Sequence, residues 1–278
     1  MTRPRGTVFI KFSNTIVSLE WGDYASGSLV SLLTTSMSHV KPALVDNIFR
    51  INRDNSTNEF IIFNNTRLVL ITKDEGVALY AIIKNIMGVI LSSTHNSVLI
   101  HSGLVSKNNR GVLLVGQSGA GKTTLTSLLC SKGWAYHSDE MVSINGDNTV
   151  WEGFSRPLFF KPGWENIHPH LVGSTCFTIF NNHITVIPTA SIMNGVSAEN
   201  EVTPGAIVFI NYRAGCLPRL EMINKAPAAL KLSTSVMNVD CLSKHFLRVV
   251  SDISRSVPSY MLTYSSFMDL DSIDSLLS

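Results

Sequence analysis

The chain has 278 residues, which suits one large domain or two domains of ordinary size. Its 22 basic residues nearly balance its 20 acidic residues and no basic stripe stands out, so the charge gives no support to a nucleic-acid partner. The four cysteines are far apart and include no CxxC pair, which favours free thiols in a reducing cytoplasm over disulfides or a zinc site. They are Cys130, Cys176, Cys216 and Cys241.

Residues 1–94 are predicted to form a small N-terminal module of mixed α+β structure. Short apolar stretches alternate there with turn-rich segments, a pattern typical of short strands. The predicted strands are Thr7–Phe12, Thr15–Leu19, Phe60–Phe63 and Arg67–Ile71. Because the module contains no catalytic motif, we expect it to serve substrate recruitment or assembly.

The module ends in a predicted helix at Glu75–Ser92, which contains the most hydrophobic stretch of the chain, Ala78–Leu91. Lys84 and Asn85 interrupt this stretch, so it is too short and too polar at its centre to span a bilayer. We interpret it as the buried helix of a soluble protein and expect no membrane partner. Lys11 breaks the first apolar run of the chain, so we expect no export signal and a cytoplasmic location.

Residues 95–278 are predicted to form the catalytic domain. Its central buried strand is Gly111–Val115, which follows a hairpin turn at Asn108-Asn109 and precedes a helix at Lys122–Ser131. The other predicted strands are Ser97–Ser106, Trp134–His137, Met141–Ile144, Phe177–Phe180, Ile184–Ile187, Ala206–Tyr212 and Ser259–Tyr264, with a turn at Asn181-Asn182 and further helices at Pro227–Thr234 and Val239–Ser254.

A glycine-rich loop between the central strand and its helix matches the pattern G-x-x-x-x-G-K-[ST] in full. It reads Gly116-Gln117-Ser118-Gly119-Ala120-Gly121-Lys122-Thr123 and is followed by Thr124. Glycines let the backbone N–H groups of the turn converge on an anion, and the next helix directs its positive dipole end at the same place. Lys122 adds a cation for the outer phosphates, and the Thr123 hydroxyl is placed to ligate Mg²⁺. The loop therefore predicts a P-loop that binds ATP with Mg²⁺, and the alternative is a glycine-rich turn that merely caps a helix.

An acidic pair, Asp139-Glu140, follows the strand that comes after this helix. Ligands of open α/β sheets gather outside the carboxyl ends of the strands, so a carboxylate there would lie near the terminal phosphate. It can hold Mg²⁺ directly or through water, or accept the proton of an attacking hydroxyl. A solvated acidic turn or a helix cap is the alternative. His101 lies in the strand before the central strand, where a histidine is more often part of the core than functional.

The segment that carries these residues resembles the catalytic half of HPr kinase/phosphorylase, and in particular the HPr-kinase-related branch with Gly-Trp and Ser-Asp-Glu at the corresponding points. The resemblance is strong over Val98–Ile144 and weaker to the end of the chain. It rests on Leu99–Gly103, Gly111–Thr123 and Lys132–Glu140, and then on Ser155–Lys161, Val208–Tyr212 and Tyr260–Ser265.

The resemblance implies an α/β fold: a P-loop kinase domain of the HPr kinase C-terminal type, preceded by the small α+β domain. It implies that His101 is an active-site histidine, that Lys122 is the P-loop lysine and that Asp139 deprotonates the acceptor serine. It also implies metal ligation by Thr123, Asp139 and Glu140. Because some relatives phosphorylate serines of lasso-peptide precursors, the implied partner is a protein or peptide that bears a serine.

The chain departs from the true HPr enzyme in two places. That enzyme has two aspartates where this chain has Asp139-Glu140, and its Leu-Glu-Ile-Arg-Gly metal-binding segment is absent, although Glu152-Gly153 lies in the corresponding region. These differences argue against HPr as the acceptor and against phosphorylase activity. The hexamers of the true enzymes make a homo-oligomer conceivable here, and Arg156, Lys161 and Arg213 are further candidate cations. A nucleotide-binding regulatory subunit without turnover and a small-metabolite kinase stay open as alternatives.

Overall fold

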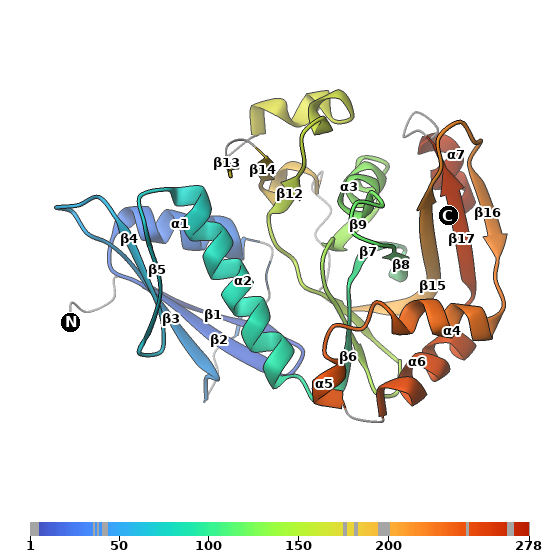
Figure 1. Ribbon diagram of the computed structural model, residues 1–278, viewed down its shortest axis with the longest axis horizontal. Helices are drawn as coiled ribbons and strands as arrows, with labels where there is room; N and C mark the ends of the chain where they lie inside the picture. The colour runs from blue at the N-terminus through green and yellow to red at the C-terminus, as the bar shows by residue number, and fades with distance from the viewer. Residues whose placement is uncertain are drawn as a thin grey trace. The chain divides into compact units, whose positions relative to one another are not determined.

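The structure is a computed structural model of a mixed α/β protein (Figure 1), in agreement with the α/β class expected from the sequence. It describes residues 6–35, 37, 39–40, 44–174, 177–180, 183–193, 201–242, 245–265 and 270–277. The predicted turn at Asn181-Asn182 and one of the four cysteines, Cys176, lie outside the described residues. The other three cysteines, Cys130, Cys216 and Cys241, are free thiols.

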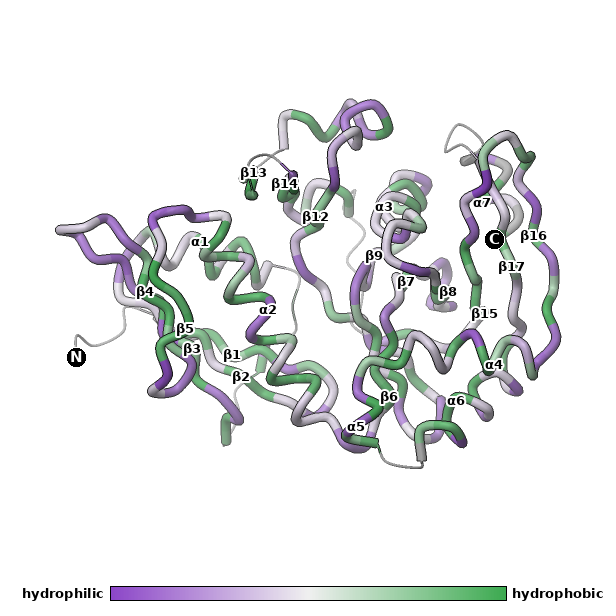
Figure 2. The backbone as a smooth tube through the Cα atoms, in the orientation of Figure 1, coloured by the Kyte–Doolittle hydropathy of each residue, from purple (hydrophilic) through white to green (hydrophobic). Residues whose placement is uncertain are grey.

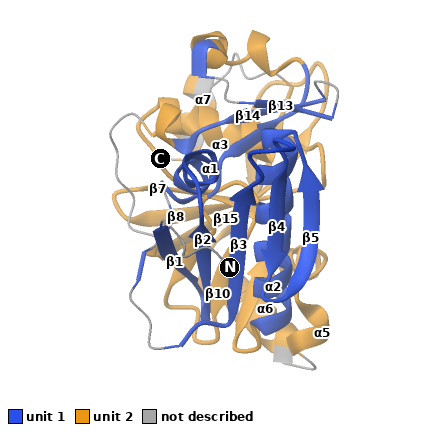
Figure 3. Cartoon of the chain, turned by 90° about the vertical axis from the view of Figure 1, so that its left-hand side faces the viewer, with its two compact units in different colours: residues 1–93, 156–162, 173–189 blue, residues 94–155, 163–172, 190–278 orange. Residues whose placement is uncertain are grey.

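The chain divides into two compact units (Figure 3). Unit 1 consists of Met1–Ser93, Arg156–Pro162 and Gly173–Thr189, and unit 2 consists of Thr94–Ser155, Gly163–Val172 and Ala190–Ser278. The first division falls close to the predicted module boundary at residues 94 and 95. The two later segments of unit 1 are a correction, because the sequence analysis assigned them to the catalytic domain.

Unit 1 is built on a five-stranded sheet with the order β1-β2-β3-β4-β5. Its elements are β1 (Gly6–Phe12), β2 (Thr15–Trp21), α1 (Tyr24–Thr34), β3 (Asn47–Arg53), β4 (Phe60–Asn64), β5 (Arg67–Thr72) and α2 (Glu75–Ser93). The pairs are antiparallel except β2 and β3, which are parallel because α1 provides the crossover between them. Helix α1 and strand β3 were not predicted.

Helix α2 combines the composition of a membrane span with the burial of a core helix. Among the described residues it is the one helix long and apolar enough to cross a membrane, and half of its most apolar window is buried inside the structure. It packs against β4 and β5 of its own unit, and green segments of its tube alternate with paler and purple ones in Figure 2. Burial against a sheet accounts for its hydropathy, as the sequence analysis expected.

The two later segments of unit 1 form a small antiparallel sheet with the order β12-β14-β13. Its strands are β12 (Leu158–Phe160), β13 (Phe177–Ile179) and β14 (Ile184–Ile187). Strand β13 packs against α2 so closely that a Cβ atom on Gly76 would overlap the Ile179 side chain. This contact between segments a hundred residues apart is the reason that the chain returns to unit 1.

A protein that begins at Thr94 is therefore expected to be poorly soluble. It would lack α2 while retaining β12, β13 and β14, whose apolar side chains would lose their partner and form an exposed apolar patch. Size-exclusion chromatography of this truncation should show aggregates, with the full-length chain as the control. A monodisperse truncation would show that the three strands do not depend on residues 1–93.

Unit 2 contains a nine-stranded mixed sheet whose main path has the order β6-β10-β11-β15-β8-β7-β9, with β17 beside β15 and β16 beside β17. Its strands are β6 (Ser97–Ile100), β7 (Ser102–Lys107), β8 (Arg110–Val115), β9 (Ala135–Ser138), β10 (Val142–Asn145), β11 (Trp151–Gly153), β15 (Glu201–Tyr212), β16 (Arg219–Met222) and β17 (Ser259–Tyr264). Its helices are α3 (Lys122–Ser131), α4 (Lys225–Ser233), α5 (Val239–Leu242), α6 (His245–Ser256) and α7 (Leu270–Leu277). Short 3₁₀ turns occur at Trp164–Asn166, Pro169–Ser174 and Thr189–Ser191.

The core of unit 2 lies between one face of this sheet and helices α4, α5 and α6. Alternate residues of the central strands point into it, such as Leu113 and Val115 of β8 and Ile207 and Phe209 of β15. Helix α3 packs against β7, β8 and β9. The helix predicted at Val239–Ser254 covers α5 and most of α6, and residues 243–244 between them lie outside the described residues.

The directions of the strands bring the predicted site residues to one edge of the sheet. Strands β8, β15 and β17 are parallel, and β9 runs in the same direction because both it and β8 are antiparallel to β7. The glycine loop, Asp139 and Arg213 therefore leave the sheet at the same edge, where β7 begins. The strand predicted at Ser97–Ser106 is wrong in one respect: it is two strands, and His101 lies in the break between them.

Candidate active site

The glycine loop connects β8 to α3 in the strand–loop–helix order predicted from the sequence. Gly119 has φ +85°, and Gly121, the N-cap of α3, has φ 93°. Both values lie in the left-handed region that side chains disfavour, which explains the glycines at these two positions. Gln117, Ser118 and Gly119 are exposed, so the top of the loop faces solvent. The loop thus offers solvent-accessible backbone beside the N-terminus of a helix.

Lys122, the first residue of α3, folds its side chain back over the loop. Its ammonium donates hydrogen bonds to the carbonyl oxygens of Gly116 (2.7 Å) and Gln117 (3.2 Å), and the residue is only 7% exposed. An ammonium gains more from an anion than from neutral carbonyls, because the attraction of opposite charges adds to the hydrogen bond. An anion in the loop would therefore be a stronger partner for this ammonium.

Asp139 is held against the first turn of α3. Its Oδ2 accepts a hydrogen bond from the Thr123 hydroxyl at 2.8 Å, and its Oδ1 accepts one from the Tyr136 hydroxyl at 3.2 Å. The residue is only 1% exposed. The structure thus joins a hydroxyl of the glycine loop to a carboxylate of the next strand, and two hydroxyl donors fix the orientation of that carboxylate.

The turn that carries Asp139 is organised by the neighbouring Ser138. The Ser138 hydroxyl lies within hydrogen-bond distance of the carbonyl oxygens of Met141 (2.9 Å) and Phe154 (3.0 Å), and it accepts from the backbone amides of Glu140 and Met141. The hydroxyl has one proton, so it donates to one of these carbonyl oxygens at a time while it accepts from both amides, and a fully buried serine with these contacts leaves the turn little freedom. The position of Asp139 is consequently set by the backbone as well as by its own partners.

His101 contacts the same turn from the break between β6 and β7. Its Nδ1 lies 2.9 Å from the carbonyl oxygen of Glu140, and because a carbonyl can only accept, Nδ1 carries the proton. Burial lowers the pKa of His101, and the nearby charge of Lys122 lowers it further, against the opposite influence of Glu140 and Asp139. At pH 7 the ring is therefore neutral and Nε2 is an acceptor. His101, Lys122, Asp139 and Glu140, which were all predicted from the sequence, therefore lie close to one another.

Two tyrosines that the sequence analysis did not single out complete the site. Tyr136 orients Asp139, as described above. Tyr264, the last residue of β17, donates from its hydroxyl to the carbonyl oxygen of Ala120 at 2.7 Å and so ties the glycine loop to a strand 144 positions later. Tyr136 could have been found from the sequence, because it lies only three residues before Asp139. Tyr264 could not, because only the pairing of distant strands brings it to the loop.

The remaining sequence candidates are Arg213, Arg156, Lys161 and Glu140. Arg213 is exposed at the end of β15, and its backbone amide bonds to the Tyr264 carbonyl at 2.8 Å. Arg156 and Lys161 belong to unit 1. Glu140 is half-buried beside His101. Within the described residues no three histidine, cysteine or acidic side chains gather closely enough to hold a metal ion by themselves, so a cation here would need the Thr123 hydroxyl and ligands from the substrate.

Replacing Tyr136 with phenylalanine tests its positioning role. The change removes the donor to Asp139 Oδ1 and keeps the ring, and loss of one such hydrogen bond costs about 1 kcal/mol. We expect the activity predicted from the sequence, phosphoryl transfer from ATP, to fall by about 5-fold with the KM for ATP unchanged. Tyr260→Phe is the matched control, and equal rates for Tyr136→Phe and wild type in a kinase assay would remove Tyr136 from the site.

Together these features define a mixed α/β protein whose strand–glycine loop–helix unit places a lysine, a threonine hydroxyl and a buried carboxylate at one edge of its sheet. No protein-family model and no curated protein sequence matches the chain. Among solved structures, the Hpr(Ser) kinase/phosphatase from Coxiella burnetii matches with 12% sequence identity and a TM-score of 0.36. The match covers 64% of this chain and 92% of that one.

Proposed function

We propose that the protein is an ATP-dependent kinase that phosphorylates a serine hydroxyl on a protein or peptide. The observation that carries the proposal is the 2.8 Å hydrogen bond between Thr123 and Asp139, directly beside Lys122. A hydroxyl that follows the loop lysine and a carboxylate at the end of a neighbouring strand are the pair that holds Mg²⁺ in P-loop enzymes. A helix cap alone would not require either the buried lysine or the buried carboxylate.

In this proposal the glycine loop binds the phosphates of ATP. The backbone N–H groups of residues 117–121 and the N-terminus of α3 supply neutral donors, and Lys122 supplies the cation. Transfer of its ammonium from the Gly116 and Gln117 carbonyls to phosphate oxygens would replace two neutral acceptors by charged ones. The residues available for Mg²⁺ are Thr123, Asp139 and, at the half-buried position beside them, Glu140. Bound Mg²⁺ would neutralise charge on the transferred phosphoryl group.

The acceptor hydroxyl requires a positioned base, and the site offers Asp139 for this role. Its carboxylate is fixed by Thr123 and Tyr136, which suits a group that must meet a hydroxyl in one geometry. His101 is neutral and holds the adjacent backbone through Nδ1, so it can support the turn and accept a further hydrogen bond at Nε2. We further propose a cytoplasmic location and neither a nucleic-acid nor a membrane partner.

The test is phosphosite mapping by mass spectrometry after the full-length protein has been incubated with ATP, Mg²⁺ and candidate peptides from its genomic neighbourhood. The proposal expects phosphoserine in one of these peptides and about 10²-fold slower formation of it with the Asp139→Asn variant. ATP consumption without peptide phosphorylation would favour a small-metabolite kinase instead. Nucleotide binding without any turnover would contradict the proposal and favour a regulatory subunit.

A further inference from the structure

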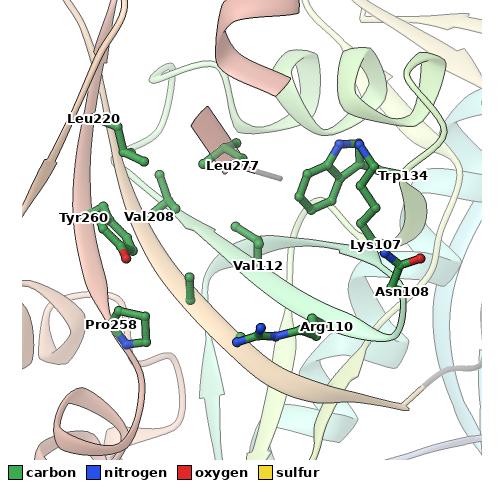
Figure 4. Close-up of a pocket in the computed structure, with 12 residues that line it drawn as sticks. Lys107, Asn108, Arg110, Val112, Trp134, Val208, Leu220, Pro258, Tyr260 and Leu277 are labelled. Carbon is green, nitrogen blue, oxygen red and sulfur yellow. The ribbon is translucent and has the colours of Figure 1, made fainter. Parts of the chain in front are cut away.

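A cavity in unit 2 lies away from the glycine loop. It has a volume of about 510 Å³, within the range of small-molecule sites. Figure 4 shows that its floor is formed by the apolar side chains of Val112 and Val208, with Tyr260 on one side and Trp134 on the other. Arg110 and Lys107 provide the positive groups at its rim. The lining thus combines an apolar floor, aromatic walls and two cations.

The cavity is separate from the proposed kinase site. Arg110 begins β8 and Val115 ends it, and the glycine loop starts only after Val115. A strand of this length spans about 17 Å at about 3.3 Å per residue. Tyr260 likewise lies near the beginning of β17, whereas Tyr264, at the end of that strand, contacts the loop. The cavity therefore lies at the amino ends of the strands, and the glycine loop lies at their carboxyl ends.

The two cations at the rim form an unfavourable pair. Lys107 and Arg110 are directly opposite across the hairpin whose turn residues are Asn108 (φ 52°) and Asn109 (φ 60°), so their side chains emerge on the same face. Like charges in such a cross-strand pair are destabilising.

The two cations differ in their partners. The Lys107 ammonium lies 3.3 Å from Asp274 and 5.4 Å from the centre of the Trp134 ring. Arg110 has neither an ion-pair partner nor a side-chain hydrogen bond among the residues that the structure describes, and its guanidinium extends across the cavity in Figure 4. One positive charge at the rim is therefore left without a counter-charge from the described part of the chain.

We propose that this cavity binds a small organic anion that consists of one carboxylate or sulfonate on an apolar body. The anionic head would pair with the Arg110 guanidinium, whose planar donors suit a carboxylate, and would relieve the repulsion between Arg110 and Lys107. The apolar body would contact Leu220, Pro258 and Tyr260, which line the cavity and keep surface exposed to water. A highly charged molecule such as ATP fits poorly, because the floor of the cavity offers no further cations.

The test uses 8-anilinonaphthalene-1-sulfonate, a fluorescent sulfonate with an apolar body, titrated into the full-length protein. We expect Arg110→Gln to weaken binding about tenfold, as loss of one charge-assisted hydrogen bond does. Arg248→Gln is the matched control, because Arg248 is an exposed arginine on α6 of the same unit, and we expect it to bind like wild type. Octanoate, a carboxylate with an apolar chain, should displace the probe.

A second variant and a competition experiment keep the inference open to refutation. Ala206→Leu, which adds bulk to a residue that lines the cavity, should also weaken binding of the probe. Saturating ATP should leave the probe bound. Equal affinities of wild type and Arg110→Gln, or displacement of the probe by ATP, would overturn the proposal. Failure of the kinase proposal would leave these outcomes unchanged, since they do not depend on catalysis.

Discussion

Replacing Lys122 with alanine is expected to lower phosphoryl transfer by about 10³-fold, the upper range for loss of one preorganised charge donor. The ammonium is buried over the loop and is the loop's one charged side chain within the described residues. Backbone donors and the N-terminus of α3 remain in the variant, so part of the ATP affinity should survive. The measurement is the rate of phosphopeptide formation at saturating ATP.

Lys132→Ala is the matched control for this variant. Lys132 follows the last residue of the same helix, and its ammonium pairs with Asp271 instead of facing the loop. The control should retain the wild-type rate. A Lys122→Ala protein that is folded by circular dichroism and transfers phosphate as fast as the control would show that the glycine loop is only a structural turn.

Replacing Asp139 with asparagine is expected to lower transfer by about 10²-fold while ATP binding changes little. A positioned general base contributes roughly 10²–10⁴-fold, and the loose transition state of phosphoryl transfer favours the lower end. The structure adds a second cause. Asparagine replaces one acceptor oxygen by an NH₂ group, so either the Thr123 or the Tyr136 hydroxyl would have to accept a hydrogen bond where it now donates one. Single-turnover rates measure the loss of phosphoryl transfer, and calorimetric affinities measure any change in ATP binding.

Glu140→Gln is the neighbouring control for this second variant. The Glu140 side chain is half-buried, and it is the backbone carbonyl of this residue that holds His101, a contact which the substitution preserves. We expect a smaller loss than for Asp139→Asn. If Asp139→Asn and wild type were equally active, the assignment of Asp139 as the base would be wrong and the base would have to be another group.

Local signals in the sequence predicted the part of the site that is contiguous in the chain. The strand, glycine loop and helix of residues 111–131 were predicted within one residue of their bounds, because apolar patterning and glycine placement are local properties. Strand β17 was predicted with the bounds that the structure gives. The break at His101 was missed, since the residues on both sides are buried and nothing in their pattern marks two strands.

Other features depend on contacts between distant segments and could not be predicted. The return of β12, β13 and β14 to unit 1 follows from packing against α2, and the contact of Tyr264 with Ala120 follows from strand order. Helix α1 was missed despite a local signal. Asp23 caps it by accepting from the Ser26 amide, and an aspartate before a run with apolar residues at helical spacing is a helix start. The roles of Asp139, His101 and Lys122 stay predictions, although the structure places all three together.

The most direct test of the central claim is calorimetric titration of the full-length protein with ATP in the presence and absence of Mg²⁺. We predict one binding site, with weaker binding when Mg²⁺ is withheld, because the Asp139 carboxylate would then face the phosphates without a bridging cation. The Lys122→Ala variant should bind more weakly in both conditions. The absence of any binding by the wild-type protein at about 1 mM ATP, the upper end of common substrate constants, would contradict the assignment of the glycine loop as a phosphate site.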